Sequence, residues 1–188
     1  MTRDLAVIGG GLIGLAVAVE AARAGMDVAL LEAERLGRHA SGASAGGVRS
    51  LNRHPAEIPL ARAALALWRE LPERIGAECG FRASGQIRVA LDAQGLAALE
   101  ARAARTRALG YAHERMIGPD ALAEIEPGLA GRALGALMVE DDGFADPLAT
   151  LRAYRAAARR AGVALREGAR VAALSARGSG VRSEERRV

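Results

Sequence analysis

The feature that most constrains this chain is a cluster of four glycines near its start, within Leu5–Gly14. The apolar run Leu5–Ile8 predicts a buried parallel strand, and the glycines after it predict a tight turn that leads straight into a helix. The first turn of that helix has N–H groups without intrahelical acceptors, so it favours an anion rather than a metal. A second apolar run, Val28–Leu31, ends at Glu32, whose carboxylate can accept hydrogen bonds from both ribose hydroxyls. The sequence therefore predicts a βαβ unit that binds a dinucleotide.

The same stretch has a competing interpretation as a secretory signal, because Arg3 precedes the uncharged run Leu5–Val19. Asp4, the glycines and the lack of a small-residue cleavage site argue against that interpretation. The run is also too short to cross a bilayer, so we expect no membrane span.

The composition limits the possible partners. All 26 basic residues are arginines, and they are scattered among acidic residues, which is typical of solvated helix faces rather than of a nucleic-acid surface. Cys79 is the only cysteine, which excludes an intrachain disulfide and a cysteine metal site. We therefore expect no metal, no nucleic-acid partner and a cytoplasmic location.

The middle of the chain differs in character from the first 32 residues and predicts an inserted unit over residues 84–144, made of antiparallel strands and surface helices. The other expected elements are a loop over 37–49, a helix over 56–71, and strands over 163–166 and 170–174 that return to the first sheet. Leu60, Leu67 and Leu71 lie on the apolar side of the helix over 56–71, and Pro72 interrupts it. Asp92 can cap a helix that runs to Leu109, and Asp146 caps a helix over 148–160. Residues 182–188 have no apolar period and match the translation of a common sequencing adapter. We expect them to be a non-native tail.

Five segments together carry a resemblance to a known family. They are the glycines of 9–14 with Glu32, and residues 41–49, 59–68, 81–87 and 143–147. The chain resembles the amino-acid and amine oxidase family of flavoproteins, which includes D-amino acid oxidase, glycine oxidase and sarcosine oxidase. The resemblance runs from residue 1 to about 175. It implies an α/β fold with a Rossmann-like FAD-binding domain, a doubly wound parallel sheet over residues 1–83 and 145–181, and part of an inserted antiparallel-sheet substrate domain over 84–144.

The resemblance also implies FAD as cofactor and assigns its contacts. These would be Gly9, Gly11, Leu12, Ile13 and Gly14 at the pyrophosphate, Glu32 at the adenosine ribose, Gly42, Ala43, Ser44, Gly46 and Gly47 along the flavin and diphosphate, and Val171 at the adenine. Ser44 can donate its hydroxyl to a phosphate oxygen, and the Gly46–Gly47 pair permits close backbone approach. The alternative for residues 41–49 is a flexible linker.

Arginines after this loop are the candidates for substrate contact. In relatives, an arginine here lies near the flavin or binds a substrate carboxylate, so Arg49 and Arg53 are candidate active-site residues. The alternative is that they are surface arginines, which are common in this chain. His39 could suggest covalent flavin attachment, but its position does not match that of the relatives, and a solvated loop histidine is the preferred interpretation.

The implied chemistry is oxidation of the C–N bond of a small amino acid or secondary amine by hydride transfer to flavin. The sequence leaves open the substrate, the electron acceptor, covalent attachment of the flavin and the oligomeric state. Two other functions also remain open: a nicotinamide-dependent dehydrogenase, and a truncated, non-catalytic fragment or nucleotide-binding scaffold. The second is considered because relatives continue well past this length.

Overall fold

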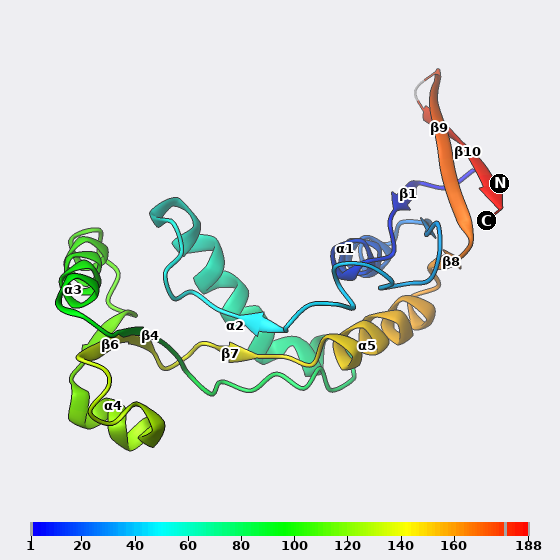
Figure 1. Cartoon of the computed structure of the whole chain (residues 1–188). Coiled ribbons are helices and arrows are strands. Elements are labelled where there is room, and N and C mark those ends of the chain that lie inside the picture. Colours follow the sequence, from blue (N-terminus) through cyan, green and yellow to red (C-terminus); the bar gives the residue numbers. More distant parts are fainter. Residues whose placement is uncertain (1, 179, 188) are drawn as a thin grey trace. The chain divides into compact units, whose positions relative to one another are not determined.

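The computed structural model describes residues 2–178 and 180–187 and divides the chain into two compact units. Unit 1 comprises Met1–Gly46, Glu70–Gly80 and Ala145–Val188, and unit 2 comprises Gly47–Arg69 and Phe81–Phe144. Figure 1 follows the elements along the chain by colour. Both units are therefore assembled from segments that are distant in sequence.

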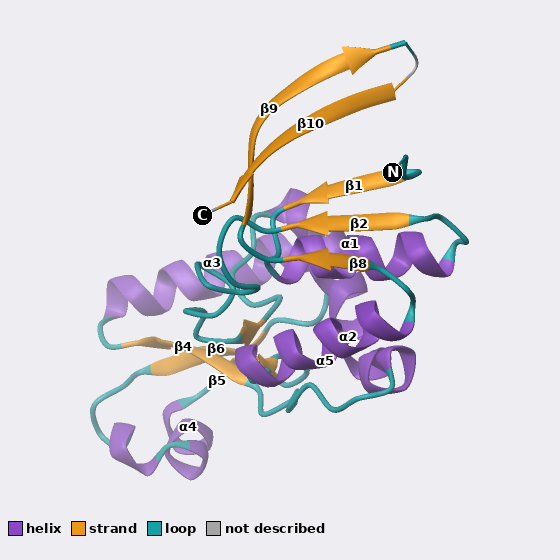
Figure 2. Ribbon diagram, turned by 90° about the vertical axis from the view of Figure 1, so that its right-hand side faces the viewer, coloured by secondary structure: helices purple, strands orange, loops and turns teal. Residues whose placement is uncertain are grey.

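Unit 1 is built on a parallel sheet in the order β1-β2-β8. Its strands are β1 (Leu5–Ile8), β2 (Val28–Leu31) and β8 (Ala164–Arg166), and the helices of the unit are α1 (Leu12–Arg23) and α5 (Pro147–Arg160). Leu5 lies opposite Val28, and Ala29 lies opposite Ala164. Figure 2 shows the three strands side by side, pointing the same way, with α1 against the sheet. The predicted α/β fold with a βαβ unit at its start is confirmed.

The core of unit 1 lies where α1 meets β2. All four residues of β2 are buried, as expected for a central parallel strand covered on both faces. On α1, Leu15, Ala18 and Val19 are fully buried, and the small side chain of Ala18 allows the helix to lie close to the sheet. This packing fixes the start of α1 relative to the ends of the strands.

Unit 2 contains an antiparallel sheet in the order β4-β6-β5. Its elements are β4 (Gln86–Ala90), α3 (Ala93–Ala108), β5 (Arg115–Ile117), α4 (Pro119–Ile125), the short 3₁₀ helix η2 (Pro127–Leu129) and β6 (Gly135–Val139). Asp92 caps α3 by accepting a hydrogen bond from the N–H of Gly95, as predicted. The sequence did not indicate β6, although Leu137 at its centre is fully buried.

A second, two-stranded pairing joins the start and the end of unit 2. The strand β3 (Gly47–Val48) pairs with β7 (Gly143–Phe144) in antiparallel register. The 3₁₀ helix η1 (Pro55–Glu57) follows β3 and leads into α2 (Ile58–Ile75). Because of this pairing, residues 47–69 belong with residues 81–144, whereas the sequence suggested a boundary at residue 84.

Two expectations about α2 are wrong. The helix continues through Pro72 to Ile75, because Leu71 and Ile75 are buried and tertiary packing holds the last turn in place. The expected apolar side is also displaced, since Leu60 is 74% exposed while Leu65 is buried.

The end of the described chain also differs from expectation. The strand β9 (Ala169–Arg177) does not join the first sheet but forms an antiparallel hairpin with β10 (Gly180–Arg187). Residues 182–187, part of the expected non-native tail, lie in β10, and Val188 lies outside the described residues. Over residues 2–178 and 180–187, no helix is both long and apolar enough to cross a membrane.

Candidate dinucleotide site

The glycine-rich turn between β1 and α1 is held by backbone geometry that only glycine satisfies. Gly9 has φ +102°, and its N–H donates to the carbonyl of Leu31 at 2.8 Å. A Cβ at Gly14 would lie 1.9 Å from the carbonyl oxygen of Gly9. The first turn of α1 therefore lies directly against the end of β1. As a result, the N–H groups of Leu12, Ile13 and Gly14 lie in the first turn, where helix N–H groups have no intrahelical partner.

Glu32 is placed beside this turn by the end of β2. Its side chain accepts hydrogen bonds from the N–H of Gly10 at 2.7 Å and from the N–H of Glu34 at 2.8 Å, and the residue is 8% exposed. Each carboxylate oxygen has two lone-pair positions, so one on each oxygen is left for a further donor such as a ribose hydroxyl. The structure therefore brings the predicted glycines and the predicted acid together.

Gly10 and Ser41 belong to this site although the sequence did not single them out. A Cβ at Gly10 would lie 2.2 Å from the Cδ2 atom of Leu36. The Ser41 hydroxyl accepts a hydrogen bond from the N–H of Leu12 at 2.9 Å, and a Cβ at Gly11 would approach that oxygen to the same distance. Ser41 thus tethers the following loop to the start of α1 and keeps its own proton available for a ligand oxygen. Only its place at the head of the small-residue segment could have pointed to it.

The loop over 42–47 makes close backbone approaches and a hydrogen bond of its own. A Cβ at Gly42 would lie 2.2 Å from the carbonyl oxygen of Gly37, and Gly46 has φ +75°. The Ser44 hydroxyl accepts from the N–H of Gly46 at 3.0 Å, which leaves its proton free to donate. Ala43 and Gly47 are exposed. At Gly47 an added Cβ would meet only the amide nitrogen of Gln86, at 3.9 Å, so the fold itself does not require glycine there.

The remaining predicted residues lie elsewhere. Val171 lies in β9, half-buried, opposite Glu185 of β10. Arg49 and Arg53 lie in unit 2, where Arg49 directly follows β3 and Arg53 lies four residues further on. His39 is an exposed loop residue whose side chain lies 3.3 Å from Glu34, consistent with the preferred interpretation.

The shifted pKa values of unit 2 belong to residues outside these candidates. The hydrogen bond from Arg62, with the charge of Arg69, lowers the pKa of Asp141. Burial lowers the pKa of His113, although the nearby Glu114 opposes the shift.

A cavity of about 800 Å³ in unit 1 lies between the β1-β2 strands and β10, and its lining includes neither the residues 9–14 nor Glu32.

Known proteins resemble this chain in sequence and in fold. Residues 4–188 match the family described as FAD dependent oxidoreductase. The chain is 35% identical over 164 residues to glycine oxidase of Geobacillus kaustophilus (strain HTA426), covering 82% of this chain and 43% of that protein. It is 33% identical over 183 residues to mitochondrial dimethylglycine dehydrogenase of Homo sapiens, covering 94% of this chain and 21% of that protein.

Among solved structures, the crystal structure of glycine oxidase from Geobacillus kaustophilus matches with a TM-score of 0.88 and 28% identity. That match covers 97% of this chain and 51% of the other. The chain thus spans about half, or less, of the length of these relatives. It belongs to the FAD-dependent oxidoreductase family.

Proposed function

We propose that this chain forms part of an enzyme that oxidises the C–N bond of a small amino acid or secondary amine. In this proposal unit 1 carries the adenine-dinucleotide part of FAD, and unit 2 forms part of the substrate domain. Loss of a hydride from the substrate α-carbon and of a proton from the nitrogen gives an imine, which water hydrolyses. Bound FAD supplies the hydride acceptor.

The observation that carries the proposal is the buried carboxylate of Glu32 beside the first turn of α1. A carboxylate next to an anion-binding helix end has no role for a lone phosphate, which offers no hydrogen-bond donor to it. The pair suits a ligand with a diphosphate at one end and a sugar diol next to it, as in FAD. The cradle fits such a ligand because Gly9, Gly11 and Gly14 leave the turn without side chains. Within it, Ser41 and Ser44 keep hydroxyl protons that can be donated to phosphate oxygens.

The substrate class rests on the relatives and on the arginines of unit 2. The glycine oxidase and the dimethylglycine dehydrogenase are named for small amino acids that carry a carboxylate next to the amine. A guanidinium binds a carboxylate through two parallel hydrogen bonds, which suits Arg49, with Arg53 as its neighbour. We propose these two residues as the substrate-carboxylate side of the site and Val171 as a backbone contact to the adenine.

Two further predictions complete the proposal. We propose a cytoplasmic location on the ground that the single cysteine, Cys79, is buried and free. We also propose that residues 182–188 are not native. Sequencing the gene past codon 181 tests this, and a native reading frame through codon 188 would contradict it.

The test of cofactor binding is a flavin titration of the protein expressed from its complete gene. We expect a visible flavin absorbance band, and we expect Glu32→Ala to weaken FAD by about 1.5–3 kcal/mol through lost charge-assisted hydrogen bonds. Glu34→Ala is the matched control, because Glu34 pairs with Arg38 and His39 at the surface. Equal affinities of the two variants would remove Glu32 from the site. Binding of flavin without turnover of glycine or sarcosine would favour a nucleotide-binding scaffold.

A further inference from the structure

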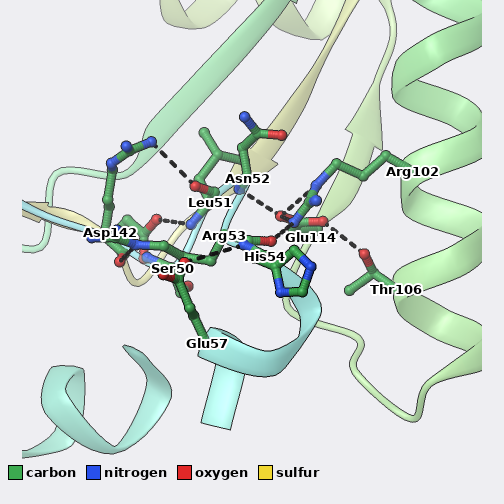
Figure 3. Close-up of polar contacts among 11 residues, drawn as sticks. Ser50, Leu51, Asn52, Arg53, His54, Glu57, Arg102, Thr106, Glu114 and Asp142 are labelled. Atoms are coloured by element: carbon green, nitrogen blue, oxygen red, sulfur yellow. Dashed lines mark hydrogen bonds and ion pairs between the residues drawn. The ribbon is translucent and has the colours of Figure 1, made fainter. Parts of the chain in front are cut away.

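The segment from Arg49 to Arg53 is held by two buried carboxylates of unit 2 (Figure 3). The first is Asp142, which is fully buried and directly precedes β7. Its Oδ1 atom accepts from the N–H of Ser50 at 2.7 Å and from the Ser50 hydroxyl at 2.9 Å, and its Oδ2 atom accepts from the N–H of Leu51 at 2.7 Å. One side chain thus fixes two consecutive peptide groups.

The second carboxylate is Glu114, which precedes β5 and whose side chain is 0% exposed. Its Oε1 atom accepts from the N–H of Asn52 at 2.7 Å and from Arg102 at 2.7 Å, and its Oε2 atom accepts from Thr106 at 3.1 Å. Arg102 also donates to the carbonyl of Arg53 at 2.9 Å. Asn52 adopts φ +57°, a conformation that these contacts stabilise.

Burying two carboxylates is costly unless every oxygen is hydrogen-bonded, and here the donors come mainly from one short turn. The N–H groups of residues 50, 51 and 52 are all bound by carboxylate oxygens. A loop that only connects β3 to η1 does not need such an arrangement. The arrangement makes the turn rigid at the point where the chain leaves β3.

The rigid turn separates the roles of the two arginines. Arg53 is half-buried, and its Nε atom donates to the carbonyl of Arg49 at 3.4 Å, so Arg53 supports the turn. Arg49 is exposed, and its guanidinium makes one long hydrogen bond, to Leu51 at 3.4 Å, among the contacts that the structure describes. Most of its five donors therefore remain for a ligand.

We infer that Asp142 and Glu114 are positioning residues that hold Arg49 to receive the carboxylate of the substrate. This inference rests on the proposed function for the identity of the ligand. It adds a reason why two charges are buried in unit 2, and it assigns the carboxylate contact to Arg49 rather than to Arg53. Because the backbone next to Arg49 is already fixed, only its side chain loses freedom on binding, so the turn raises affinity for a carboxylate.

The first experiment needs neither flavin nor substrate. Two quantities are compared in the wild type, Asp142→Asn and Glu114→Gln. They are the amide hydrogen exchange of residues 50–52 and the rate of trypsin cleavage after Arg49. We expect exchange of the Ser50 and Leu51 amides to rise about tenfold or more in Asp142→Asn, and that of Asn52 in Glu114→Gln, since each loses a charged acceptor. Glu140→Gln is the control, because Glu140 is an exposed acid that pairs with Arg115. Unchanged exchange in both variants would overturn the inference.

The second experiment measures discrimination by the protein expressed from its complete gene. The ratio of kcat/KM for sarcosine to that for dimethylamine reports how much the substrate carboxylate contributes to kcat/KM. We expect Asp142→Asn to lower this ratio about tenfold, mainly through KM, and Arg49→Ala to lower it at least as much. The double variant should show little further loss, because Asp142 acts through Arg49. A purely structural role for Asp142 would lower both substrates equally or add to the effect of Arg49→Ala, and either result would overturn the inference.

The outcomes separate the inference from the proposed function. A wild type that oxidises neither amine rejects the proposed substrate and, with it, the carboxylate role of Arg49. A wild type that prefers sarcosine, with exchange and discrimination unchanged in Asp142→Asn, rejects the positioning role alone. If Asp142→Asn fails to fold, Ser50→Ala takes its place, because it removes only one of the three hydrogen bonds to Asp142. Ser50→Ala should then raise amide exchange and lower the ratio of kcat/KM values by smaller factors.

Discussion

At the scale of single residues, two glycines of the candidate site are required for different reasons. Gly14→Ala places a Cβ 1.9 Å from a backbone oxygen, which cannot move without shifting α1. We expect a loss of about 1–3 kcal/mol in the free energy of unfolding. Gly47→Ala makes only an ordinary contact with Gln86, at 3.9 Å, and should leave stability unchanged, but it should weaken FAD if the backbone there approaches the cofactor. Denaturant unfolding and flavin titration of both variants check this, and equal stability losses would contradict it.

The residues that could be predicted are those whose role is local. Gly9 and Gly14 are needed for a tight turn and a close helix, and Glu32 follows from the length of the βαβ unit, so the spacing alone places them. Asp142 and Glu114 could not be predicted, because a buried acid and a surface acid look the same in a sequence. Their function depends on donors that lie 91 or 92 positions away for Asp142 and 62 positions away for the contact between Glu114 and Asn52.

At the scale of elements, α5 depends on its cap. Asp146 accepts from the N–H groups of Leu148 and Ala149 at 2.8 and 3.0 Å. Asp146→Ala should cost about 0.5–2 kcal/mol in the free energy of unfolding, because both N–H groups lose their acceptor. Asp146→Asn is the matched control, since asparagine caps a helix nearly as well without the charge. Chemical denaturation checks both, and an equal loss in the two variants would show that the charge, and not the cap, is what matters.

Helices whose first residue is marked by a capping side chain were predicted well, whereas strands that depend on pairing with distant strands were not. The start of α3 and that of α5 follow from Asp92 and Asp146, which act within their own helices. The strand β6 is a short apolar run that could be a strand or part of a helix, and only its pairing with both β4 and β5 decides. Similarly, β9 was predicted as a strand, but its pairing with β10 instead of the first sheet has no local signal.

At the scale of the whole molecule, the limit of prediction lies in the division into units. The parallel fold of unit 1 follows from periodicity and spacing, whereas the antiparallel sheet of unit 2 follows only in part, because its central strand β6 has no local signal. The assignment of residues 47–69 to unit 2 does not, because it depends on the pairing of β3 with β7 and on the hydrogen bonds of Asp142. The sequence suggested a single insertion over 84–144, whereas the chain passes from one unit to the other after residues 46, 69, 80 and 144.

The pH dependence of stability is also a property of the whole molecule, and His113 and Asp141 give it a definite sign. The pKa of His113 is lowered by burial, so on acidification the unfolded chain takes up this proton first, near pH 6.5. The pKa of Asp141 is lowered by Arg62, so the unfolded chain again binds the proton first, near pH 4. Both contributions are present at pH 7 and are lost as the pH falls. We therefore expect the stability difference between wild type and His113→Gln to shrink below about pH 6.5, and that with Asp141→Asn to shrink below about pH 4. Urea unfolding across this range measures both differences, and one that grows on acidification would contradict the assignment for that residue.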